Sequence, residues 1–276
     1  MDYENRKVPD HVNRNTDHPA KEFFLLGAGL LLAGILLVVM TGWAGGWLAR
    51  FIPFSYEQDI AQSFADELDK DNDSPVEKYL QAMTDELSKS IDLPAGMTIT
   101  AHYVDDDMVN AFATLGGHIM IFRGLLEAAP NENALAMVIS HEIAHVKHRD
   151  PIVAIGRGVL AQSVLSLVIG TSGNELAGKM LGNAGLLTTL NFSRRQETAA
   201  DREGLAAIYQ RYGHVNGASR IFEKFLEIEE EQGSSMPEMF QTHPASAKRI
   251  RKLAAQATDN NWPQEGDLTL MPVFDN

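Results

Sequence analysis

Residues 139–146 read Ile-Ser-His-Glu-Ile-Ala-His-Val, which contains the pattern His-Glu-x-x-His. At about 3.6 residues per helical turn, His141 and His145 lie one above the other on a single helix face. Two imidazoles held in this way can bind two positions of a tetrahedral zinc ion, and Glu142 lies beside them, where it can take a proton from water. The alternative is an ordinary amphipathic helix with two surface histidines.

The sequence around this motif predicts a buried helix that begins near Glu132. Apolar residues surround the two histidines at helical spacing: Ala134, Leu135, Val138, Ile139 and Ala144. Because a buried histidine needs a partner for its ring nitrogens, burial favours the metal site over the surface helix.

A catalytic zinc ion needs a third protein ligand and keeps its fourth position open. The best candidate lies in residues 193–201, Ser-Arg-Arg-Gln-Glu-Thr-Ala-Ala-Asp, where Glu197 and Asp201 are four residues apart in a helix-forming stretch. We expect Glu197 to bind the metal and Asp201 to accept a hydrogen bond from the outer nitrogen of a zinc histidine. By itself this stretch favours a solvated helix with charges at i and i+4, and only its pairing with the upstream motif favours the ligand role.

Taken in order, these motifs resemble peptidase family M48, the HtpX-like and CAAX-prenyl-protease-like zinc metallopeptidases. Further matches are Asn110-Ala111-Phe112-Ala113, Gly116-Gly117, Gly124-Leu125-Leu126, Thr242-His243-Pro244 and Arg249-Ile250. The resemblance covers about residues 75–256. It implies an α+β, mostly helical, zincin-like metallopeptidase domain with a small β-sheet beside the His-Glu-x-x-His helix, preceded here by one transmembrane helix.

The resemblance also implies roles for two further segments. The family's histidine at the position of His243 faces the oxyanion, where an N–H donor would stabilise developing charge. Asn110, Ala111 and Phe112 would lie along a groove that binds the substrate as an extended strand. The alternatives are that residues 242–244 only mark the start of a helix and that residues 110–113 belong to a plain hairpin.

Residues 97–122 favour strands over helices. Residues 97–104 and 111–113 are strand-like, Gly116-Gly117 is typical of a turn, and residues 118–122 predict another strand. The sequence therefore predicts a small sheet in front of the zinc helix.

Composition sets bounds on the function. The chain has 276 residues, 45% of them hydrophobic, which is enough for one sizeable core and an extra segment. It has no cysteine, so disulfides are excluded. The formal net charge of −14 argues against a nucleic-acid surface. We therefore expect no nucleic-acid partner. Protein or peptide substrates are what the family resemblance implies, and a membrane is expected from the N-terminal segment.

The N-terminal region predicts a membrane anchor. Residues 1–21 are polar and rich in turn residues, which indicates a disordered tail. Residues 22–50 predict a transmembrane helix, because no charge lies between Glu22 and Arg50 and about 20 apolar residues cross a bilayer. Trp43 and Trp47 suit an interfacial belt. A cleaved signal peptide is the alternative, although this apolar run is longer than such segments usually are.

Basic residues predict the orientation of the span. Arg6, Lys7, Arg14 and Lys21 precede it, whereas after Arg50 the next basic residue is Lys70. The positive-inside rule then places the N-terminus in the cytoplasm and the large domain outside it. The resemblance suggests a bacterial inner membrane with a periplasmic catalytic domain.

The remaining segments complete the predicted organisation. Residues 51–93 read as a helical lead-in, with Ser74 and Pro75 starting a helix, and residues 94–276 form the metallopeptidase domain. Residues 152–169 predict a helix that is buried in the domain or rests on the membrane. The glycine-rich residues 170–185 suggest a gate for the cleft. His118 and His148 are expected to be surface or packing residues: neither is expected to bind metal.

Three functions from different classes fit this sequence. The first is a membrane-anchored zinc endopeptidase acting on misfolded or membrane-proximal proteins, with one zinc ion per chain. The second is a catalytically silent protein that holds unfolded clients, although such a protein has no need of Glu142. The third is a zinc amidase acting on cell-wall peptides.

Overall fold

A computed structural model describes residues 19–68, 74–169, 192–232, 239, 243 and 246–274. The predicted tail up to residue 18 and the glycine-rich segment 170–185 lie outside the described residues. In chain order the elements are α1 (Pro19–Ala49), α2 (Phe54–Leu68), α3 (Pro75–Ile91), β1 (Thr100–Val104), β2 (Ala111–Ala113), the short helix η2 (Leu115–Gly117), β3 (His118–Phe122), α4 (Arg123–Ala128), α5 (Glu132–Lys147), α6 (Asp150–Ile169), α9 (Arg194–Tyr212), α10 (Arg220–Gln232) and α12 (Ala247–Asp259).

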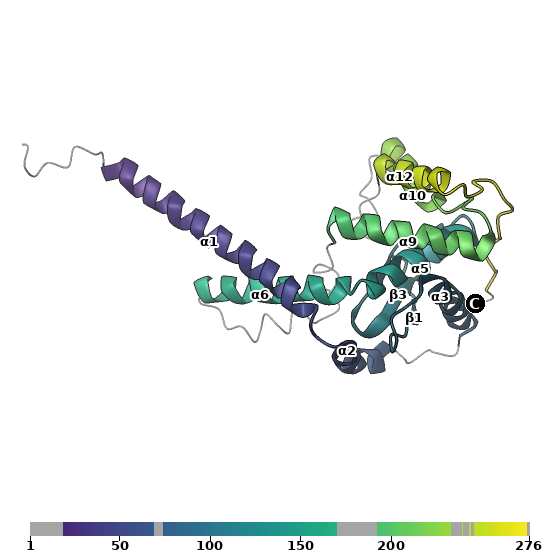
Figure 1. The fold of residues 1–276 in the computed structure, drawn as a ribbon, viewed down its shortest axis with the longest axis horizontal. Coiled ribbons are helices and arrows are strands. Elements are labelled where there is room, and N and C mark those ends of the chain that lie inside the picture. The colour runs from purple at the N-terminus through teal and green to yellow at the C-terminus, as the bar shows by residue number, and fades with distance from the viewer. Residues whose placement is uncertain are drawn as a thin grey trace, which may run out of the picture.

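Helix α5 forms the centre of the domain (Figure 1). The side chain of Asn131 caps its first turn by accepting a hydrogen bond from the backbone N–H of Ala134 at 2.9 Å. Every residue from Glu132 to Val146 is buried. Helices α3 and α9 pack against α5, and the main apolar core lies where these three helices meet the sheet.

The predicted small sheet is confirmed and has three strands in the order β1-β3-β2. Strand β3 pairs in parallel with β1 and antiparallel with β2. The hairpin between β2 and β3 turns at Gly116 and Gly117, whose φ angles of 72° and 88° strongly favour glycine. A side chain on Gly117 would also collide with the carbonyl oxygen of Thr98.

Strand β2 forms one edge of the sheet and presents that edge to α5. Hydrogen bonds join Phe122 N to Asn110 O at 3.1 Å and Thr114 N to His118 O at 2.8 Å. Because neighbouring residues of a strand alternate in direction, the backbone of Ala113 points away from β3. Its N–H donates to Oε2 of Glu142 at 2.9 Å. The sheet edge therefore meets α5 at the glutamate of the motif.

Helices α1 and α6 project together from the domain (Figure 1). Among the described residues, α1 contains the one segment, Ala20–Ala49, that is long and apolar enough to cross a membrane. Its most apolar part is exposed, unlike the core helix of a soluble protein. Helix α6 is continuously buried only through Ile155; beyond that point Ser166 is also buried, and the helix extends along α1. The prediction of a domain-buried helix thus fits only its first turns.

Glycines allow α1 and α6 to approach closely. A Cβ atom on Gly45 would lie 2.2 Å from the carbonyl oxygen of Gly156, and one on Gly156 would lie 2.7 Å from the Cβ of Ala49. Small residues are common where membrane helices meet, because close backbones gain van der Waals contact there. The two helices thus form one unit next to the domain.

Candidate metal centre

Four buried side chains converge in front of α5. Each of His141, His145, Glu197 and His243 offers one ligand atom, and these atoms all lie within 4.8 Å of one another. The histidines of α5 are fully buried, and Glu197 comes from the first turns of α9. A capping box starts α9, in which Ser193 and Gln196 bond to each other's backbone N–H. This cap fixes where α9 begins and hence where Glu197 points.

Two carboxylates orient the histidines. Nδ1 of His145 lies 2.8 Å from Oδ2 of Asp150, and Nδ1 of His141 lies 3.0 Å from Oδ1 of Asp201. In the neutral ring each Nδ1–H donates to its carboxylate, so each Nε2 carries a lone pair. Nε2 of His141 and Nε2 of His145 are 3.1 Å apart. Two lone pairs that face each other in a buried space repel unless a proton or a metal ion lies between them.

The spacing of these atoms fits zinc. Ligands held about 2.0–2.1 Å from a tetrahedral zinc ion are about 3.3 Å apart. Both histidine Nε2 atoms, of His141 and His145, lie 3.4 Å from an oxygen of Glu197. Nδ1 of His243 lies 2.9 Å from Oε1 of Glu197. Two imidazoles and one carboxylate, with a third imidazole beside them, form a donor set that suits zinc and other first-row divalent metals.

The shifted pKa values of the cluster also indicate a site for a cation. Burial lowers the pKa of His145, but hydrogen bonds to Asp150 and Glu197 outweigh burial and raise it to about 10. The pKa of His141 is likewise raised, because Asp201 and Glu197 outweigh burial and the repulsion from Arg249. Burial raises the pKa of Glu197, yet the surrounding histidines hold it far below its usual range. A divalent cation could take the place of the protons that this charge otherwise attracts.

Glu142 and His243 face each other across the cluster. Oε1 of Glu142 lies 3.6 Å from Nε2 of His243, beyond hydrogen-bond distance. Neither atom has a hydrogen-bond partner among the described residues. Burial is the main reason that the pKa of His243 is lowered, so its ring is neutral. Two unsatisfied polar atoms at this spacing mark a place for a polar group of a ligand or for water.

Arg249 supports the cluster from behind. Its guanidinium donates to both carboxylate oxygens of Asp201 at 2.7–2.9 Å and to the backbone oxygen of His243 at 3.2 Å. It also lies over the ring of Phe222, 4.5 Å from the centroid. The sequence indicates Arg249 only as part of the family resemblance and gives it no role of its own, because nothing local shows that α12 reaches α5.

Two more residues of the site were missed. Asp150 follows the motif by five residues and orients His145, while Phe192 stacks on the His145 ring with centroids 4.2 Å apart. The acidic residue just after the His-Glu-x-x-His helix was a sequence signal that could have identified Asp150. Phe192 lies just after residues 170–191, a part of the chain that the sequence left without a predicted element.

The three residues expected in a substrate groove lie at the sheet edge next to the cluster. Asn110, Ala111 and Phe112 are all buried. Ala111 is fully buried and shares the main core, while Phe112 packs with Phe192. At the start of the edge, the backbone N–H of Met239 reaches the oxygen of Val109 at 3.4 Å. The strand thus lies beside Glu142 but is covered in this structure.

The two histidines that we set apart from the cluster have other contacts. His118 stacks on His102 of the neighbouring strand, with ring nitrogens 2.7 Å apart. Nε2 of His148 lies 2.9 Å from Oε1 of Glu203, which also binds Lys147. Neither histidine belongs to the four-residue cluster.

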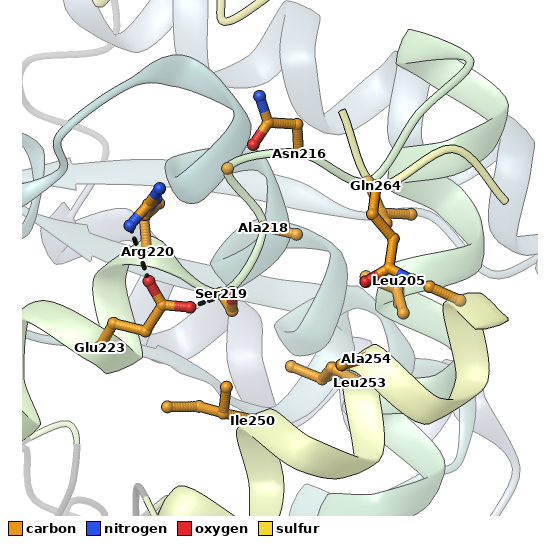
Figure 2. Close-up of a pocket in the computed structure, with 13 residues that line it drawn as sticks. Leu205, Asn216, Ala218, Ser219, Arg220, Glu223, Ile250, Leu253, Ala254 and Gln264 are labelled. Carbon is orange, nitrogen blue, oxygen red and sulfur yellow. Dashed lines mark hydrogen bonds and ion pairs between the residues drawn. The ribbon is translucent and has the colours of Figure 1, made fainter. Parts of the chain in front are cut away.

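Two cavities adjoin α12. The first has a volume of about 380 Å³ and reaches Glu197, so it opens beside the metal cluster; it is lined by Phe192, Arg194, Glu197, Thr198, Asp201, Ser246, Lys248, Arg249 and Lys252. The second has a volume of about 260 Å³ and lies between α9, α10 and α12 (Figure 2). No residue of the cluster lines the second cavity.

Comparison with known proteins agrees with this geometry. Residues 74–257 match the model of Peptidase family M48. The chain is 35% identical over 154 residues to the mitochondrial metalloendopeptidase OMA1 of Schizosaccharomyces pombe, a match that covers 55% of this chain and 44% of that protein. It is 31% identical over 160 residues to the beta-barrel assembly-enhancing protease of Escherichia coli (strain K12), covering 53% of this chain and 32% of that protein. The match thus spans less than half the length of either relative.

Proposed function

The chain belongs to peptidase family M48, and we propose on this premise that it is a membrane-anchored, zinc-dependent endopeptidase that hydrolyses peptide bonds in proteins. Four converging ligand atoms beside an unsatisfied carboxylate oxygen of Glu142 carry this proposal. A protein that only holds clients needs neither the ligand cluster nor a buried glutamate without a partner.

We assign His141, His145 and Glu197 as the zinc ligands. A bound zinc ion would act as a Lewis acid, which polarises a carbonyl group and lowers the pKa of a water molecule toward about 7. Asp150 and Asp201 keep the ring nitrogens of the two histidines directed at the cluster. Such outer hydrogen bonds raise ligand basicity and fix the tautomer.

Glu142 is the general base in this mechanism. Its Oε2 is held by the backbone N–H of Ala113, which leaves Oε1 to accept a proton from the attacking water. The same carboxyl group then gives this proton to the leaving amine. Because the bond from Ala113 comes from the sheet edge, the strand that would align a substrate also positions the base.

His243 is placed to stabilise the negative charge that develops on the carbonyl oxygen. Its Nε2 faces the gap next to Glu142 and has no partner among the described residues. This role requires the tautomer with the proton on Nε2. Nδ1 then directs a lone pair at Glu197, a contact that a bound cation would make favourable.

The substitution Glu142→Gln tests the proposed catalytic mechanism. It preserves shape and zinc but removes the proton acceptor, so cleavage of unfolded casein should fall about 10²- to 10⁴-fold. Glu127→Gln, which changes an exposed side chain of α4, is the matched control and should leave cleavage unchanged. Equal cleavage by wild type and Glu142→Gln would refute the mechanism.

Other outcomes point to the other two functions. Binding of unfolded casein without cleavage, in wild type and variant alike, would indicate a client-holding protein. Release of fragments from cell-wall peptides by a wild type that spares proteins would indicate an amidase.

Helix α1 supports the membrane anchor, and the excess of basic residues before it supports a cytoplasmic N-terminus. We propose that the zinc domain lies on the outer side of a bacterial inner membrane. A phosphatase reporter that is active only outside the cytoplasm should be active after Asn276 and silent after Asn15. The opposite pattern would reverse the topology.

The substrates that we propose are misfolded or membrane-proximal proteins. A relative's name, beta-barrel assembly-enhancing protease, points to a role in protein assembly. The contact of α6 with both α1 and α5 holds the site next to the apolar helix and supports membrane-proximal substrates. We also propose that the chain is divided into a tail (1–21), an anchor (22–50), a helical lead-in (51–93) and the zinc domain (94–276).

A further inference from the structure

The cavity beside the metal cluster has an unusual charge for this protein. It is formed by one face of α9, where Arg194, Glu197 and Asp201 follow at i, i+3 and i+7, and by the first turns of α12. Lys248 and Lys252 are four residues apart on α12 and therefore share a face. Together with Arg249, four basic side chains thus line one cavity of a chain whose net charge is −14.

The two carboxylates in this cavity are already neutralised. Asp201 pairs with Arg249, and Glu197 is directed at the histidines of the cluster. In contrast, Arg194, Lys248 and Lys252 are exposed and make no ion pair with any carboxylate among the described residues. Within the part of the chain that the structure describes, Lys252 donates only to the hydroxyl of Thr198, at 2.9 Å. The open rim of the cavity is therefore cationic.

The second cavity next to α12 gives a contrast within the same protein. There the basic residue Arg220 is paired with Glu223 at 3.1 Å, and Glu223 also accepts from Ser219 (Figure 2). Charge at that cavity is balanced by its own residues. At the cavity beside the metal cluster, the positive charges of Arg194, Lys248 and Lys252 are not balanced by carboxylates among the described residues, so they are available to a bound ligand.

Helix stability does not explain these basic residues. Arg194 is the first residue of α9 and Lys248 the second residue of α12. The helix dipole favours acidic side chains in the first turn and disfavours basic ones. Both basic side chains therefore lie where they destabilise their helices. Residues that oppose a local preference in this way are typical of functional sites.

We propose that Arg194, Lys248 and Lys252 form a substrate subsite that selects an acidic side chain close to the scissile bond. The proposal rests on the endopeptidase function and adds a substrate class to it. Glu197 lines the same cavity, so a side chain bound there belongs to a residue within a few positions of the cleaved bond. A volume of about 380 Å³ accommodates one or two side chains.

The expected preference is moderate. Each exposed ion pair contributes little, and three of them together correspond to about a tenfold preference for Glu over Gln in kcat/KM. The preference should reside mainly in KM, because the contacts are the same in the bound substrate and the transition state. It should shrink as salt is raised from low to high concentration, since these side chains are exposed.

The test uses the full chain in nanodiscs of neutral lipid, loaded with zinc. A mixed peptide library, read by mass spectrometry, should show Asp or Glu enriched at one fixed position from the cut. Matched peptides with Glu, Gln or Lys at that position then give kcat and KM. The double variant Lys248→Glu with Lys252→Glu should reverse the order, so that the Lys peptide becomes the better substrate.

Arg251→Glu is the matched control, because Arg251 is exposed on the same helix and does not line the cavity. It should keep the preference for Glu. The double variant and Arg251→Glu should both keep the zinc content of wild type, which a merely structural defect would reduce.

Binding separates this proposal from the endopeptidase itself. Glu142→Gln, titrated with the same labelled peptides, should bind the Glu peptide more tightly than the Lys peptide, even if wild type cleaves neither. Equal binding and equal cleavage of the three peptides would overturn the subsite. An unchanged preference in the double variant would also overturn the subsite. A double variant that alters only binding to vesicles containing phosphatidylglycerol would overturn it too, because that result would assign Lys248 and Lys252 to the membrane surface.

Discussion

Oδ2 of Asp150 lies 2.8 Å from Nδ1 of His145. Asp150 is the first residue of α6, the helix that packs along the apolar helix α1. Its other oxygen accepts from the side-chain amide of Gln196 at 2.5 Å, which ties α6 to the start of α9. One carboxylate thus connects α6, which packs along α1, with α5 and with the helix that provides Glu197.

Asp150→Ala should weaken zinc binding about 10- to 100-fold, because His145 loses the acceptor that fixes its tautomer. Competition with a fluorescent zinc chelator measures this change. Asp59→Ala, which removes an exposed carboxylate on α2, should bind zinc as wild type does. Unchanged zinc affinity in Asp150→Ala would show that the hydrogen bond does not support the ligand.

Glu197→Ala or His141→Ala should lose most of the zinc, since each leaves two of the three assigned ligands. Wild type should carry about one zinc ion per chain by elemental analysis. His148→Ala should retain it, because His148 binds Glu203 outside the cluster. Full zinc occupancy in Glu197→Ala would mean that another side chain, such as His243, is the third ligand.

The contact between α1 and α6 predicts that an engineered disulfide can form between these two helices. A Cβ atom on Gly42 would lie 3.5 Å from that of Ala161, within the range of disulfides, and the chain has no native cysteine. Gly42→Cys with Ala161→Cys should therefore cross-link in membranes under mild oxidation. Proteolysis between the two positions, followed by gel electrophoresis without reductant, detects the bond.

Two variants control this cross-link. Gly34→Cys with Ala161→Cys should stay reduced, because nothing lies within 4 Å of a Cβ on Gly34. Gly45→Leu should reduce cross-linking at 42 and 161, since its side chain would collide with the carbonyl of Gly156. Cross-linking that is as efficient through Gly34 would contradict the helix pair.

Glu203 predicts a pH dependence of stability. Burial raises its pKa, but His148 and Lys147 outweigh burial, so the folded pKa is below the unfolded value of 4.5. A lowered carboxyl pKa gives stability that is present above the unfolded pKa and lost as pH falls through the folded one. Because the pairs are partly exposed, we expect Glu203→Gln to cost about 0.5–1 kcal/mol at pH 7.

As pH falls below 4.5 and through the lowered pKa of Glu203, the difference between Glu203→Gln and wild type should shrink and disappear. Urea unfolding of both proteins in detergent with a zinc chelator measures the difference, because zinc release then plays no part. A difference that is constant from pH 7 to pH 3 would show that the charge of Glu203 is not the cause.

Local patterns in the sequence predicted several parts of the fold. The apolar residues around His141 and His145 predicted a buried helix, and the structure has α5 from Glu132 to Lys147. The strands and the Gly116-Gly117 turn were predicted because strand propensity and positive φ are properties of a few adjacent residues. The same holds for α1, whose length and lack of charge are visible in the sequence.

Only the tertiary structure shows which distant residues meet. Arg249 reaches Asp201 and His141 across 48 and 108 residues of chain, and no periodicity of α12 reveals that contact. The path of α6 along α1 depends on Gly45 and Gly156, which are 111 residues apart (156 − 45). The sequence determined which helices and strands form and which side chains can bind metal, because these follow from local spacing. Packing between helices decided that Asp150, Arg249 and Phe192 join the cluster and that basic residues of α9 and α12 line one cavity, because such contacts depend on how whole elements fit together.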